Sequence, residues 1–134
     1  MYPIAQETAL KVKELTYIHA EAFAGGELKH GPLALIDDNI PVYIFAPSGK
    51  LFEKTASNVN EVLARGKNVT VFTDNQANIS LFEGAKVVQI PHIEEDFAPF
   101  TFVLIGQLLS YYAANFLGHD VDRPRNLAKS VTVE

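Results

Sequence analysis

The sequence predicts an α/β fold, a three-layer αβα sandwich with a parallel sheet. Three short segments have the length and the Val, Ile and Phe content of buried strands: 41–47, 68–73 and 85–90. They are apolar on both faces, which is typical of strands in a parallel sheet covered by helices. Helical patterns lie before, between and after these strands, as an α/β architecture requires.

The chain opens on a helical pattern and not on a strand. Residues 3–16 are rich in Ala, Leu, Lys and Glu, and Pro3 suits the first turn of a helix. Glu7, Lys11 and Glu14 recur at helical spacing, so they share one face. An α/β domain ordinarily begins with a strand, and three strands make a narrow sheet. We therefore expect a parallel sheet that lacks its first strand.

The segments between the helix and the first two strands follow local signals. Residues 18–25 are expected to form a second short helix that ends at two glycines, followed by a compact connector at 27–36. Residues 51–65 carry apolar side chains at helical spacing and predict an amphipathic helix, which Gly66 ends.

The last third of the chain contains a polar loop, a long helix and a tail. We expect the loop at 74–80, and a long buried helix at 96–117 that ends at Gly118. The tail has little apolar periodicity, with a short helix expected near Asn126. The predicted domain is a single one at 1–134, divided into an α/β core at 1–119 and a carboxy-terminal tail at 120–134.

The composition limits the classes of function. The formal net charge is −5 and no basic face is evident, so nucleic acid and anionic membranes are unfavourable partners. The absence of cysteine excludes disulfides and thiol catalysis. The long apolar stretch at 97–117 is interrupted by polar residues, which argues against a membrane span. With no signal peptide in view, a cytoplasmic location is expected.

Three constellations could carry chemistry. The Glu7-Lys11-Glu14 face is either a solvated helix face or a carboxylate poised for proton transfer beside a lysine. His30, followed by Gly-Pro, is either a loop histidine with a backbone partner or an acid–base group. Lys129 is either a solvated charge in the tail or, if desolvated in a pocket, a nucleophile toward a carbonyl.

Other motifs predict no site. The Pro47-Ser48-Gly49-Lys50 segment lacks the upstream glycine of a phosphate-binding loop, so it is interpreted as a turn. The remaining histidines have no partner at metal-ligand spacing, and we expect no metal site. These residues are His19, His92 and His119.

The three constellations occur together with longer motifs in an order typical of one family. These are Tyr2-Pro3-Ile4-Ala5, Gly26-Glu27-Leu28-Lys29-His30-Gly31-Pro32 and Asp122-Arg123-Pro124-Arg125-Asn126-Leu127-Ala128-Lys129-Ser130. They resemble the end of the glutamine–fructose-6-phosphate amidotransferases, the enzymes of amino-sugar (hexosamine) biosynthesis that make glucosamine 6-phosphate. The resemblance implies a sugar-isomerase (SIS) domain, which is flavodoxin-like in fold and is the second of two in that family.

The resemblance also implies residue roles. Lys129 would form a Schiff base with the keto carbon of open-chain fructose 6-phosphate, with Ala128 beside it as a substrate-binding residue. Glu14 would move a proton between the first two sugar carbons, supported by the charges of Glu7 and Lys11. His30 would assist ring opening and reach the site from the neighbouring subunit of a homodimer. This chemistry calls for no metal or redox cofactor.

Some of the family pattern is absent from this sequence. The glutaminase domain and the first sugar-isomerase domain, whose Ser/Thr-rich loop holds the sugar phosphate, are not part of it. We therefore expect the partners to be a phosphosugar and the remaining domains of a parent enzyme, and the chain alone to be inactive. Two alternatives remain open: a non-catalytic phosphosugar-binding module and an inert structural fragment.

Overall fold

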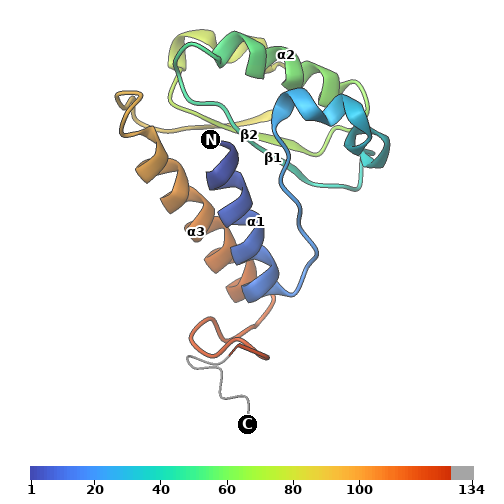
Figure 1. Cartoon of the computed structure of the whole chain (residues 1–134), viewed down its shortest axis with the longest axis vertical. Coiled ribbons are helices and arrows are strands. Elements are labelled where there is room, and N and C mark those ends of the chain that lie inside the picture. The colour runs from blue at the N-terminus through green and yellow to red at the C-terminus, as the bar shows by residue number, and fades with distance from the viewer. Residues whose placement is uncertain (128–134) are drawn as a thin grey trace. The chain divides into compact units, whose positions relative to one another are not determined.

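The fold is that of a computed structural model, which describes residues 1–127 (Figure 1). The chain divides into two compact units. The sheet unit comprises Phe23–Pro99, and the helical unit comprises Met1–Ala22 together with the described residues from Phe100 to Leu127. The helical unit thus joins two segments that are far apart in the sequence, so tertiary contacts hold it together.

The sheet unit contains three parallel strands: β1, Val42–Phe45; β2, Val69–Thr73; and β3, Lys86–Gln89. They are hydrogen-bonded in the order β1-β2-β3. The register places Ile44 of β1 beside Val71 of β2, and Val71 beside Val87 of β3. All three predicted strands are confirmed, as is the α/β class with a parallel sheet.

Helix α2, Phe52–Leu63, supplies the core of the sheet unit and confirms the predicted amphipathic helix. Its buried side chains recur every three or four residues, which places them on one stripe. Val59 and Val62 are fully buried and belong to the same apolar cluster as Val71 of the central strand. Burying each such side chain contributes about 1.5–3 kcal/mol relative to leaving it in water.

The polar loop predicted at 74–80 is a 3₁₀-helix, η3, Gln76–Phe82, with a kink at Asn78. The burial of its last residue, Phe82, explains why this segment forms a compact turn of helix. Phe82 is 1% exposed and packs edge-on against Phe52, with ring centroids 5.6 Å apart. The segment therefore folds back to place one aromatic side chain in the core.

The helical unit is built from two long helices, both predicted: α1, Tyr2–Thr16, and α3, Ala98–Phe116. They lie alongside each other (Figure 1), with Thr8 of α1 directly against Gly106 of α3. Helix α1 ends at Tyr17, whose φ of 62° is left-handed, and Gly118, with φ 75°, follows the end of α3. None of the described helices is long and apolar enough to cross a membrane.

Three local predictions are wrong. Residues 18–24 form no helix; the next elements are two 3₁₀-helices, η1, Gly25–His30, and η2, Pro32–Leu35. A helix as short as the predicted one is marginal without an apolar face to pack, which explains the error. Helix α3 is not buried throughout, because Phe100 and Phe116 are 72% and 92% exposed. Near Asn126 the chain forms a turn, since its φ of 62° is incompatible with a right-handed helix.

Candidate functional site

The predicted polar face of α1 forms one connected cluster. The Lys11 ammonium lies 2.6 Å from Oε2 of Glu14 and 3.7 Å from Oε1 of Glu7. Lys11 thus bridges both carboxylates, as the spacing of four and three residues along a helix allows. The hydrogen bond to Glu14 is the largest cause that raises the pKa of Lys11, with smaller contributions from the charges of both glutamates.

The ion pairs of this cluster contribute little to stability. Partly exposed ion pairs contribute at most about 1 kcal/mol each. Glu14 is the least exposed member, at 26% of its side chain, and its contact with Lys11 engages only Oε2. Oε1 of Glu14 is therefore not engaged by Lys11. A carboxylate held through one oxygen by a permanent cation can accept and return a proton through the other.

The carboxy-terminal end of α1 carries a second arrangement that the sequence did not reveal. The backbone N–H of Arg125 donates to the Tyr17 hydroxyl at 2.9 Å, and the Arg125 guanidinium lies 3.9 Å from the centre of the Tyr17 ring. The His119 ring packs on the same tyrosine, with centroids 4.7 Å apart. The tail is thereby fastened to α1. The predicted residues Ala128 and Lys129 lie outside the described residues.

His30 belongs to the sheet unit, whereas Glu7, Lys11 and Glu14 belong to the helical unit. It is the last residue of η1 and is exposed. Gly31 follows with φ 145° and ψ −52°, a conformation that favours glycine. The preceding Lys29 pairs with Glu61 of α2 at 2.9 Å, which ties η1 to that helix. His30 is thus presented on an anchored turn, open to solvent.

A third cluster, at the carboxyl ends of the strands, was missed by sequence reasoning. Ser48 follows β1, Asp74 follows β2 and His92 follows β3. Asp74 accepts hydrogen bonds from the Ser48 backbone N–H at 2.6 Å and from the Ser48 hydroxyl, and His92 Nδ1 lies 3.1 Å away. The cluster could have been predicted from the positions of these residues just after the strands, because the carboxyl ends of parallel strands meet at one edge of a sheet.

The electrostatics of this cluster are those of a structural anchor. Burial of Asp74 would raise its pKa, but the hydrogen bonds from Ser48 and from the Ile93 backbone outweigh burial and lower the pKa. The arrangement is not that of a hydrolytic triad. The Ser48 hydroxyl donates directly to the Asp74 carboxylate, and His92 Nδ1 lies 3.1 Å from that carboxylate and 3.4 Å from the Ser48 hydroxyl. In a triad the two ring nitrogens of the histidine face different partners, whereas here Nδ1 faces both.

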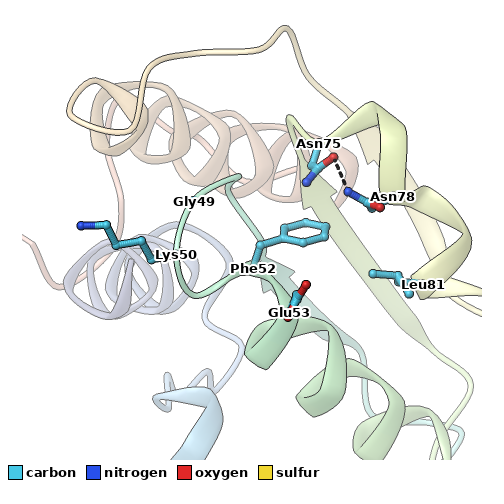
Figure 2. Close-up of a pocket in the computed structure, with 7 residues that line it drawn as sticks. All are labelled: Gly49, Lys50, Phe52, Glu53, Asn75, Asn78 and Leu81. Atoms are coloured by element: carbon cyan, nitrogen blue, oxygen red, sulfur yellow. Dashed lines mark hydrogen bonds between the residues drawn. The ribbon is translucent and has the colours of Figure 1, made fainter.

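Two open hollows of about 320 Å³ each adjoin this edge of the sheet. Figure 2 shows the first, where Asn78 donates a hydrogen bond to Asn75 at 3.2 Å. Its lining residues are Gly49, Lys50, Phe52, Glu53, Asn75, Asn78 and Leu81. The Glu95 carboxylate also lies against Gly49, so the turn before α2 has charges of both signs around it, from Glu53, Glu95 and Lys50. Within residues 1–127, no three acidic or histidine side chains are grouped to hold a metal ion.

Comparisons with known proteins match almost the whole chain. The glutamine–fructose-6-phosphate aminotransferase (isomerizing) of Yersinia pseudotuberculosis is 59% identical over 133 residues, which are 99% of this chain and 22% of that protein. The corresponding protein of Pseudomonas putida is 56% identical over the same length. The chain thus spans about a fifth of the length of the curated relatives it matches.

Solved structures agree with this match. The C-terminal domain of glucosamine-fructose-6-phosphate aminotransferase from Francisella tularensis is 47% identical, with a TM-score of 0.84 over 92% of this chain and 35% of that one. Tagatose-6-phosphate ketose/aldose isomerase from Escherichia coli covers 86% of this chain and 33% of its own with a TM-score of 0.73, but at 23% identity it shows the fold alone. The SIS domain family model matches residues 1–116. The chain belongs to the SIS domain family.

Proposed function

We propose that this chain is the carboxy-terminal sugar-isomerase lobe of a glutamine–fructose-6-phosphate aminotransferase. Its substrate would be fructose 6-phosphate, converted with glutamine-derived ammonia to glucosamine 6-phosphate. The observation that carries the proposal is the Lys11 bridge between Glu7 and Glu14, in a chain whose full-length relatives bear that name. The glutaminase and the other sugar-isomerase domain would be supplied by the rest of a longer protein.

The geometry of α1 supports a specific role for Glu14. Conversion of a ketose to an aldose removes a proton from the first sugar carbon and returns one to the second. A single carboxylate on one face of the sugar can do both, because it alternates between base and acid. Lys11 holds Oε2 at 2.6 Å and so orients the group, which leaves Oε1 to move the proton.

The roles proposed for the remaining site residues rest on the resemblance to the amidotransferase family. Lys129 would form an imine with the keto carbon, losing water, and the imine would make the neighbouring C–H more acidic. Ala128 would contact the sugar beside it. His30, on an exposed turn after η1, would assist ring opening in the partner subunit of a homodimer. A cytoplasmic location is part of the same proposal.

The test uses a fusion in which this chain replaces the matching 133 residues of the Yersinia pseudotuberculosis relative. Borohydride is added in the presence of fructose 6-phosphate, and the adduct is located by peptide mass spectrometry. We expect one adduct, on Lys129, which is lost in Lys129→Arg and kept in the control Lys13→Arg. No adduct, or an adduct on another lysine, would overturn the assignment.

The same fusion separates the proposal from its alternative. Saturable binding of fructose 6-phosphate with neither adduct nor turnover would favour a non-catalytic phosphosugar-binding module. Replacing Glu14 by Gln should lower kcat by roughly 10²–10⁴-fold, the usual contribution of a general acid–base group. We expect the 134-residue chain alone to form no glucosamine 6-phosphate from ammonia.

A further inference from the structure

We infer that Tyr17 is a positioning residue, which fixes the start of the carboxy-terminal tail against the helix that bears Glu14. This inference rests on the proposed function, because it concerns the approach of Lys129 to the sugar. The structural part of it stands on contacts within the helical unit alone.

The Tyr17 side chain is held by two residues of the segment that follows α3, His119 and Arg125. The Arg125 backbone N–H donates to its hydroxyl at 2.9 Å, across 108 positions in the sequence. The Arg125 guanidinium stacks over its ring at 3.9 Å from the centroid, an attractive arrangement for a cation and an aromatic face. The His119 ring packs against it at 4.7 Å with a tilt of 58°. Ring face and hydroxyl are therefore both engaged by the segment that follows α3.

The backbone of Tyr17 is equally constrained. Its φ of 62° and ψ of 14° are left-handed, which is uncommon for a residue other than glycine. Its N–H bonds to the Lys13 carbonyl at 3.1 Å and closes the last turn of α1. Thr16 fixes the same turn, since its hydroxyl donates to the Val12 carbonyl and accepts from the Ile18 N–H. A left-handed conformation of this kind is kept where several surrounding contacts hold the residue in place.

The segment that reaches Tyr17 is built from turns. Gly118, with φ 75°, ends α3, and the Asp120 carboxylate accepts from the N–H groups of Asp122 and Arg123 at 2.9 and 3.2 Å. Arg125 then meets Tyr17. The chain is thus directed back to the carboxy-terminal end of α1 before it continues toward Lys129.

The position of this contact gives it a consequence for catalysis. Glu14 precedes Tyr17 by three residues, and Lys129 follows Arg125 by four. Four residues can span at most about 14 Å, whereas the eleven from Gly118 could span roughly 40 Å. Fastening the tail at Arg125 therefore shortens the tether of the lysine. The −3/2 power dependence of effective concentration on tether length sets an upper bound of about fivefold on this benefit.

The test compares Tyr17→Phe with wild type in the fusion described above. The variant keeps the ring and loses only the hydroxyl that Arg125 binds. We expect borohydride-trapped adduct on Lys129 to form two- to fivefold more slowly, with kcat reduced in proportion and KM for fructose 6-phosphate unchanged. Amide exchange at Arg125 should become faster. Arg125→Met, which removes the stacked cation, should change adduct formation in the same direction.

The matched control is Tyr112→Phe, which removes a hydroxyl from an exposed tyrosine of the same unit. It should leave adduct formation, kcat and exchange at Arg125 unchanged. Wild-type adduct rates in both Tyr17→Phe and Arg125→Met would overturn the positioning role while leaving the proposed function intact. Absence of any Lys129 adduct in the wild-type fusion would overturn the proposed function, and the positioning role with it.

Discussion

Thr8 of α1 occupies the space that a side chain at Gly106 of α3 would need. A Cβ at position 106 would lie 3.0 Å from the Thr8 Cβ and 3.1 Å from its Cγ2, closer than ordinary van der Waals contact. Rotating Thr8 cannot relieve the clash, because its Cβ is fixed to the backbone and its hydroxyl is bonded to the Ile4 carbonyl at 2.8 Å. The two helices of the helical unit depend on this glycine for their close approach.

Gly106→Ala should therefore destabilise the helical unit. Alanine would gain up to about 1 kcal/mol of helix propensity, but overpacking of a tight contact costs about 1–3 kcal/mol, and we expect the cost to be larger. The free energy of unfolding from urea titration measures the difference. The control is Gly26→Ala, where a Cβ would meet nothing within 4 Å. An unchanged or higher stability of Gly106→Ala would show that the close packing of the two helices does not depend on this glycine.

Asp74→Asn should destabilise the sheet unit by on the order of 2–3 kcal/mol, because a buried charge-assisted hydrogen-bond centre is lost. The Asp74 side chain is 2% exposed and accepts from the loops that follow β1 and β3. Denaturant midpoints followed by circular dichroism measure the effect. Asp37→Asn is the matched control, since Asp37 accepts backbone N–H groups in an exposed turn. Equal effects of the two changes would contradict the anchor role.

The contribution of Asp74 should depend on pH. Its pKa in the folded chain lies below the ordinary value of 3.8, so folding favours the charged form. The stabilisation is therefore fully present above pH 3.8 and is lost as the pH falls through the lowered pKa. The difference in stability between wild type and Asp74→Asn should be constant from pH 7 to 5 and shrink in strong acid. A stability difference between wild type and Asp74→Asn that grows in strong acid would contradict a lowered pKa of Asp74.

Lys11→Met should lower kcat of the fusion by roughly 10–100-fold, with a smaller change in KM, because a misplaced catalytic group costs rate more than binding. The variant keeps the length of the side chain but removes the cation 2.6 Å from Glu14. Steady-state formation of glucosamine 6-phosphate is the measurement. Lys13→Met, on the same helix, is the control. Equal kcat in the two variants would argue that Lys11 is only a surface charge.

Local patterns predicted most of the elements correctly. The three strands, α1, α2 and α3 are recognisable because each depends on composition and periodicity over a few turns or residues. The Lys11 cluster was predictable for the same reason, since residues four and three apart on a helix are always neighbours. The membership of the chain in its family was also readable from the motifs around His30 and Lys129.

Long-range contacts could not be read in this way. The Ser48–Asp74–His92 cluster joins residues 26 and 18 positions apart, and it exists only because parallel strands bring their carboxyl ends to one edge. The Tyr17–Arg125 contact spans 108 positions and depends on a left-handed residue and a series of turns. Periodicity is local and reports which residues share one element. Which elements then meet is decided by packing and hydrogen bonding between them, and both anchors of this protein arise at that level.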